Sequence, residues 1–326
     1  MTARRPQEQL DMNDDTTILG GIDPEITDRL LSRRSAIRQG AAMSTKVAAG
    51  IAMASVPVAL AALTKDAFAQ APADVTAALN FALTLEIFEN EFYKAVLGTS
   101  SSAAQNTAFA TVRGQIPAAA VTSVQQIQKH EAAHVAFLLA NGATNSLNLT
   151  ADSFDFSGNR GSGTPGPFAR ATTELAFLLA VAQGAEDTGV RASQGQAGAL
   201  LGNRPGLEAA LRIHSVEARH ASKIRRLRRT TGAPAVVKYS GTISGGGAAA
   251  TGAGNITPAP SAAVVAAFDA IYAGEDNTTQ GGVSITGLPK LPSGFDALAA
   301  SEAFDEPLTK AQVIAIVQPF FKPTLS

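Results

Sequence analysis

Two Glu-x-x-His pairs, Glu131/His134 and Glu217/His220, use two of only four histidines in the chain. Residues three apart lie on one face of a helix, so a carboxylate and an imidazole at this spacing can coordinate the same ion. Apolar residues recur at helical spacing beside each pair, which places both pairs on core faces. A buried, unpaired carboxylate is costly, and metal coordination is one of few remedies.

Two further glutamates, Glu86 and Glu186, share the apolar faces of two other predicted helices. The chain order is therefore Glu, Glu-x-x-His, Glu, Glu-x-x-His, which matches the ligand order of di-iron and di-manganese carboxylate bundles. The six side chains offer only oxygen and nitrogen, a donor set that suits Fe or Mn. We therefore predict a site for two Fe or Mn ions whose ligands are Glu86, Glu131, His134, Glu186, Glu217 and His220.

Other interpretations of these residues stay open at this stage. His130, Glu131 and His134 form His-Glu-x-x-His, a zinc-protease signature in which both histidines bind zinc and the glutamate activates water. A single core Glu–His pair can also be a hydrogen-bonded pair with no metal. Glu89 is an additional ligand, a residue that supports the ligands from behind, or a partly exposed residue, and Tyr93 either bonds to a ligand or is an ordinary core residue.

Four amphipathic segments must position these residues: 73–98, 116–141, 169–201 and 205–230. A Gly-, Ser- and Pro-rich stretch at 152–167 predicts a long crossover between the second and third, with short links elsewhere. The expected fold is all-α, a ferritin-like four-helix bundle over 70–231 with an irregular and helical extension over 232–326. A basic cluster ends the fourth segment and is interpreted as a solvated face: Arg219, Lys223, Arg225, Arg226, Arg228 and Arg229.

The extension begins with a low-complexity stretch at 241–260. A short helix is expected at 261–273. A second helix is expected to begin at Thr309, whose spacing to Gln312 is that of a capping box. Its apolar residues predict that it docks on the bundle.

The first 69 residues predict a twin-arginine export signal and hence a periplasmic protein. Ser32-Arg33-Arg34-Ser35 precedes a weakly apolar stretch that ends at Ala67-Phe68-Ala69, a small-x-small cleavage site. Lys46 interrupts the apolar stretch, so a permanent membrane span is not expected. Ala36 departs from the usual signal, which carries an aromatic residue or Leu there.

Composition excludes several classes of function. The chain has no cysteine, which rules out disulfides, iron–sulfur clusters and a thiol nucleophile. A formal net charge of −1 argues against a general nucleic-acid binder. The expected partners are metal ions with dioxygen or peroxide, and not nucleic acid.

The motifs together resemble the ferritin-like domain family that includes plant and bacterial desiccation-related proteins. The resemblance covers the segment from Leu79 to Tyr93, both Glu-x-x-His pairs, the segment from Ala185 to Val190, and the tail segments 272–280 and 303–308. Ser193 departs from the family, which often carries Tyr there.

The resemblance implies a particular division of the ligands. Glu86 and His134 would cap one metal, Glu186 and His220 would cap the other, and the remaining two glutamates would bridge them. The resemblance implies a metal site rather than one particular reaction. Together with the export signal, the first hypothesis is an exported di-metal protein that oxidises Fe(II) or reacts with dioxygen or peroxide. A non-enzymatic stress or desiccation protein of the cell envelope is the alternative, and a zinc protease a third reading.

Overall fold

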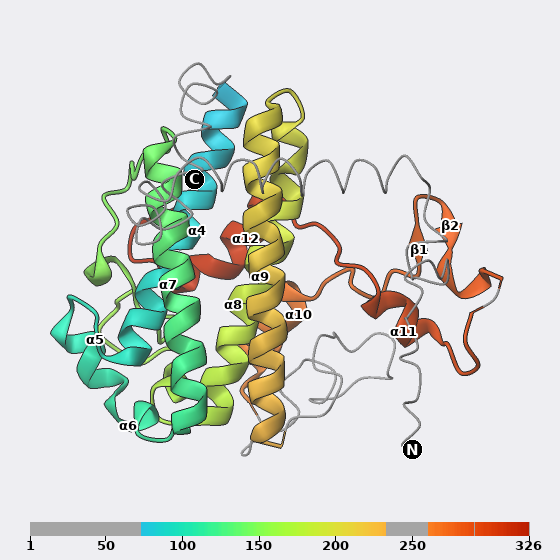
Figure 1. Cartoon of the computed structure of the whole chain (residues 1–326). Helices are drawn as coiled ribbons and strands as arrows, with labels where there is room; N and C mark the ends of the chain where they lie inside the picture. Colours follow the sequence, from blue (N-terminus) through green and yellow to red (C-terminus); the bar gives the residue numbers. More distant parts are fainter. Residues whose placement is uncertain (1–72, 233–259, 290, 326) are drawn as a thin grey trace, which may run out of the picture. The chain divides into compact units, whose positions relative to one another are not determined.

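The computed structural model describes residues 73–232, 260–289 and 291–325. The predicted export signal and nearly all of the low-complexity stretch lie outside the described residues. Four long helices form the bundle (Figure 1): α4 (Ala73–Leu97), α7 (Ala118–Ala140), α8 (Leu175–Gln196) and α9 (Arg204–Thr230). Helix α4 packs mainly on α7, and α8 packs mainly on α9. The predicted all-α bundle is confirmed.

Three of the four helices begin and end within two residues of their predicted bounds. The third segment differs, because 169–201 divides into a 3-10 turn η3 (Ala169–Thr172), α8, and a second 3-10 turn η4 (Ala197–Leu200). The backbone of Glu174 is extended, so α8 begins only after it. The side chain of Arg170 pairs with Glu174 at 2.8 Å and stabilises this break.

The link between α4 and α7 is longer than the short loop that we predicted. It contains α5 (Ala103–Ala108) and α6 (Ala110–Arg113). Arg113 ties this insertion to the bundle, because its guanidinium donates to the carbonyl oxygens of Ala95 and Val96 at 2.9 and 2.8 Å. Those carbonyls belong to the last turn of α4, where helical partners are lacking.

The crossover between α7 and α8 runs along the bundle, as expected, and includes η2 (Ala151–Ser153). Aromatic rings fix its position. The ring of Phe88 on α4 lies 5.4–6.0 Å, centroid to centroid, from the rings of Phe154, Phe156, Phe320 and Phe321. Two of these come from the crossover and two from the end of the chain, so this cluster joins three distant segments.

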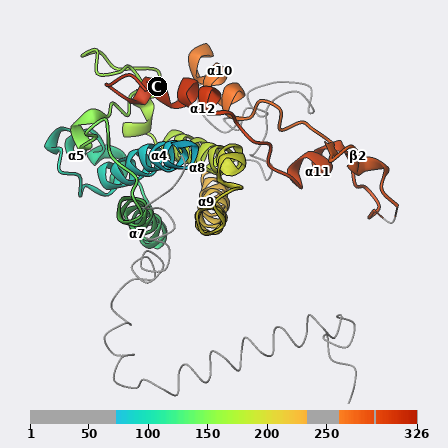
Figure 2. The same ribbon diagram turned by 90° about the horizontal axis from the view of Figure 1, so that it is seen from above.

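The C-terminal arm supplies the remaining elements: α10 (Ala262–Ile271), strands β1 (Thr279–Gln280) and β2 (Val283–Ser284), η5 (Ile285–Gly287), α11 (Ala297–Glu302), α12 (Lys310–Val317) and η6 (Gln318–Phe320). The strands form an antiparallel hairpin with Thr279 opposite Ser284. The predicted capping box between Thr309 and Gln312 is present. Helices α10 and α12 pack on α8, and Figure 2 shows them on the side of α4 and α8 opposite α7 and α9.

The arm covers the outer face of α8, so this helix is buried on two sides. Gly195 of α8 shows how closely the arm approaches. A Cβ at Gly195 would lie 1.9 Å from the carbonyl oxygen of Leu308, so only glycine allows this approach. The amide of Leu308 donates to the carbonyl of Arg191 at 3.1 Å. The arm is therefore bonded to the backbone of a bundle helix.

The prediction of a solvated basic face on α9 is wrong for two of its arginines. Arg228 is fully buried and donates to the side-chain oxygen of Gln183 at 2.8 Å. Arg225 pairs with Asp187, which also accepts a hydrogen bond from the hydroxyl of Tyr272 at 2.7 Å. Tyr272 belongs to the arm, and the sequence pattern of α9 alone could not reveal that partner.

Candidate metal centre

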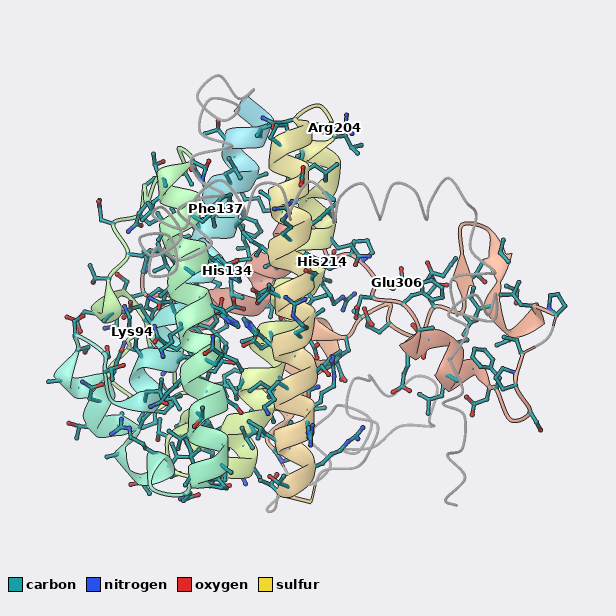
Figure 3. All side chains as sticks on the ribbon, viewed as in Figure 1. Lys94, His134, Phe137, Arg204, His214 and Glu306 are labelled. Atoms are coloured by element: carbon teal, nitrogen blue, oxygen red, sulfur yellow. The ribbon has the colours of Figure 1, made fainter. Side chains whose placement is uncertain are left out.

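Each bundle helix brings one of the four predicted glutamate ligands to the interior. Helix α4 carries Glu86, α7 carries Glu131, α8 carries Glu186 and α9 carries Glu217, and none of the four is more than 5% exposed. The two histidines enter one turn later on α7 and α9, and they are 9% and 3% exposed. Figure 3 shows His134 on the α7 segment of the bundle. All six predicted ligands therefore converge.

The ring nitrogen Nδ1 of His134 faces oxygens from three helices. It lies 3.0 Å from Glu86 Oε2, 3.1 Å from Glu217 Oε1 and 3.3 Å from Glu131 Oε2. One imidazole N–H can donate one good hydrogen bond, so it cannot satisfy three oxygens. Four donor atoms around one point are the arrangement that a cation requires.

A second group surrounds His220 in the same manner. Its Nδ1 lies 2.8 Å from Glu131 Oε1, 3.3 Å from Glu186 Oε2 and 3.6 Å from Glu217 Oε2. In each of the two groups, the candidate ligand atoms all lie within 4.8 Å of one another.

Glu131 and Glu217 belong to both groups, and each divides its two oxygens between them. Glu131 directs Oε2 to His134 and Oε1 to His220, while Glu217 directs Oε1 to His134 and Oε2 to His220. A carboxylate divided in this way can bridge two cations. Glu86 and Glu186 each belong to a single group. This division is the one that the family resemblance implied.

The donor atoms also fit a pair of metal ions in their bonding and charge. Both oxygens of Glu131, both of Glu217, Oε2 of Glu186 and Nδ1 of His220 are buried and make no hydrogen bond. Buried polar groups without partners are rare in folded proteins and call for an explanation. Two divalent cations would bind these atoms and would neutralise four carboxylates.

The crowded carboxylates shift the acidities of the centre. Burial raises the pKa of Glu86 to about 8 and that of Glu186 to about 7. Burial opposes charge on His220, but its carboxylate neighbours outweigh burial and raise its pKa to about 12. Burial would likewise raise the pKa of Glu217, yet its contacts with both histidines hold it at about 2. Without metal the centre therefore retains protons that bound cations would displace.

Two neighbours extend the centre on α4. The hydroxyl of Tyr93 donates a short hydrogen bond to Glu186 Oε1, so of the two roles considered for this residue the structure supports the bond to a predicted ligand. Glu89 is 3% exposed, and burial together with four carboxylate neighbours, Glu217 foremost, raises its pKa well above the usual range. It is therefore a buried acid beside the centre rather than a partly exposed residue.

His130 contacts the centre from outside. Its Nδ1 lies 2.9 Å from Nε2 of His220, the ring nitrogen that points away from the carboxylates. Among the described residues, neither candidate ion group contains His130, so the geometry does not favour the zinc-protease reading. The fourth histidine, His214, bonds to the carbonyl of Val190 at 3.1 Å instead. The sequence pattern identified the six central residues but gave no signal for the contact between His130 and His220.

A cavity of about 40 Å³ reaches the centre from one end of the bundle. Its walls are mostly apolar and come from α4, α7, α8, η4 and α9. Glu86, Glu89 and Glu217 are the charged residues that line it. Figure 3 labels Phe137, one of the wall residues, between His134 and the end of the bundle where Arg204 begins α9. The centre thus borders an apolar cavity on the side of Glu86.

Comparison with known proteins identifies the domain. Residues 74–230 match the family described as the ferritin-like domain. Neither the curated proteins nor the solved structures include a significant match to the chain. Within the described ranges, no helix is both long enough and apolar enough to cross a membrane.

Proposed function

Residues 74–230 are a ferritin-like domain, and on that premise we propose that the chain binds two Fe or Mn ions and exchanges electrons with dioxygen or peroxide. The observation that carries the proposal is the division of the Glu131 and Glu217 oxygens between two histidines. Two bound Fe(II) or Mn(II) ions would supply two electrons together as each is oxidised to the +3 state, and two electrons with two protons reduce dioxygen to hydrogen peroxide.

The protein's own residues have separable roles in this proposal. Glu86 and His134 would hold one ion, Glu186 and His220 would hold the other, and Glu131 and Glu217, which belong to both groups, would serve both ions. Tyr93 fixes one oxygen of Glu186 through its hydroxyl, which orients the other oxygen toward the centre. The apolar cavity excludes bulk water from the Glu86 side and leaves room for a small reactant.

Glu89 is suited to hold a proton beside the centre. Because its carboxyl is buried among four other acidic groups, its pKa is raised well above the usual range, which favours the protonated form. A neutral carboxyl can donate a hydrogen bond where an ionised one can only accept. Reduction of dioxygen consumes protons, and Glu89 lines the cavity through which a reactant would arrive.

The place of action is proposed from the sequence. The arginine pair Arg33-Arg34, the mild apolar stretch and the cleavage site at Ala69 support twin-arginine export to the periplasm. Export of an already folded chain would allow the metal to be loaded before transport.

A second candidate function is stabilisation without turnover, as in a stress or desiccation protein of the envelope. The buried oxygens without partners favour it, because an ion that satisfies them stabilises the folded state by mass action. In this case the metal would bind, raise the melting temperature and undergo no oxidation by dioxygen or peroxide.

An Fe(II) oxidation assay separates the two functions. It compares the wild type with two variants that each replace one glutamate by glutamine. Glu131→Gln removes a bridging carboxylate, while Glu208→Gln alters an exposed glutamate of α9 that pairs with Arg212. We expect Fe(II) oxidation in the wild type and in Glu208→Gln, and its loss in Glu131→Gln. Equal, measurable rates in all three would refute the proposed centre. Metal binding with no oxidation in the wild type would establish the stabilising role.

A further inference from the structure

The two halves of the bundle differ at one equivalent position. Tyr93 follows Glu86 by seven residues on α4, and Ser193 follows Glu186 by seven residues on α8. Seven residues span two helical turns, so each lies on the face of its glutamate. Tyr93 is 1% exposed, fills the core and bonds to Glu186 across the bundle. Ser193 is much smaller, and it lines the cavity that reaches Glu86.

Small residues on three of its sides keep this cavity open. They are contributed by three helices: Ala78, Ala82, Gly189, Ala192, Ala209 and Ala210. Gly189 shows that the space is restricted, because a Cβ there would lie 3.0 Å from Glu89 Oε1. On one half of the bundle the ring of Tyr93 covers the glutamate, and the smaller cavity of about 20 Å³ that Tyr93 lines has no predicted ligand in its wall. On the other half the cavity beside Ser193 reaches Glu86.

The cavity wall selects the kind of molecule that can enter. Apart from the carboxylates of the centre, its polar lining residues are Ser193 and Gln196. A hydrated cation would have to give up its water shell against an apolar wall, which is costly. Water itself needs several polar partners to occupy a cavity, and roughly 10–15 Å³ is enough room for one molecule. About 40 Å³ therefore accommodates a diatomic gas but not a long organic chain.

We propose that this cavity admits dioxygen, a small apolar molecule, to the metal position of Glu86 and His134. The proposal rests on the proposed function, and it adds the side of the centre from which dioxygen arrives and the residue that determines it. Dioxygen would arrive at the ion held by Glu86 and His134 rather than at the ion of Glu186, which Tyr93 covers. Ser193 is the residue that determines this choice.

Xenon is a suitable probe, because it is apolar, close in size to dioxygen and visible in diffraction. Crystals of the wild type, of Ser193→Tyr and of the control Ser193→Ala would be compared under xenon pressure. We expect xenon in the cavity of the wild type and of Ser193→Ala, and none in Ser193→Tyr. Ala209→Leu fills the same cavity from α9 and replaces Ser193→Tyr if that variant does not fold. An empty cavity in both the wild type and Ser193→Ala would overturn the proposal.

Kinetics then test whether the cavity is used. With Fe(II) loaded and metal content unchanged, Ser193→Tyr should slow oxidation by dioxygen at least about tenfold, equivalent to about 1.4 kcal/mol. Oxidation by hydrogen peroxide, which is polar, should slow less. An unchanged dioxygen rate in a variant that excludes xenon would overturn the proposal, as would equal slowing with both oxidants. Xenon binding needs no metal, so a chain that held xenon but no metal would refute the proposed function and not the cavity.

Discussion

Replacement of His130 by alanine tests the contact behind the metal centre. The Nδ1 atom of His130 lies 2.9 Å from Nε2 of His220, and the two rings are stacked with centroids 5.1 Å apart. If His220 binds metal through Nδ1, its Nε2 carries the proton and donates it to His130. This bond fixes the tautomer and the ring orientation of the ligand.

The size of the effect follows from the surroundings of His130. Loss of such a partner typically lowers metal affinity roughly 10- to 100-fold. His130 is partly exposed, and its other ring nitrogen lies 2.7 Å from the amide nitrogen of Gln126 at the surface. Water can replace an exposed partner, so we expect the lower half of this range, about 10- to 30-fold, or about 1.4–2 kcal/mol. Only the ion held by His220 should weaken, so one binding step should remain unchanged.

Titration with Mn(II) or Co(II) against a competing chelator would measure both steps. His214→Ala is the matched control, because His214 lies on α9 one turn before Glu217 and bonds to a backbone carbonyl. His130→Asn should recover much of the affinity, because its amide oxygen can accept the same hydrogen bond. Equal affinities in His130→Ala and His214→Ala would refute the reasoning, and so would equal weakening of both ions.

Three further predictions concern stability and export. Arg191→Met should lower the free energy of unfolding in urea by about 3–5 kcal/mol, since it removes the guanidinium that pairs with the buried carboxylate of Glu275, 3.0 Å away; a loss below 1 kcal/mol would contradict this role. The metal-free protein should melt at a lower temperature as the pH rises from about 5 to 8, because groups such as Glu86 (pKa about 8) and His220 (pKa about 12) keep protons that the unfolded chain releases; a rising melting temperature would oppose it. Replacement of the arginine pair at 33–34 by lysines should leave the precursor in the cytoplasm in a fractionation assay, and normal maturation would exclude the twin-arginine route.

The sequence predicted the parts of this structure that depend on one helix at a time. Helical periodicity fixed three of the four bundle helices closely, and it placed all four central glutamates on buried faces. The repeated Glu-x-x-His spacing led to the prediction that the six central side chains form one site. Such features are local, because in a helix with 3.6 residues per turn the spacing of two residues determines whether their side chains lie on the same face.

Features that depend on distant partners could not be predicted. The apolar pattern of α9 gave no indication that Arg228 is buried. Its acceptor Gln183 lies on another helix, and Gln183 in turn donates a hydrogen bond to Tyr272 of the arm. The short helices before α7 were missed because they bury few apolar residues. The cavity beside Ser193 arises from what five elements leave unfilled, and no single segment encodes it.

The central claim is that two ions occupy the bundle, and anomalous scattering from crystals grown with Fe or Mn tests it most directly. The account predicts two peaks per chain, one beside Glu86 and His134 and one beside Glu186 and His220, with Glu131 and Glu217 in contact with both. A single peak coordinated by His130 and His134, or no peak after metal-replete expression, would contradict it.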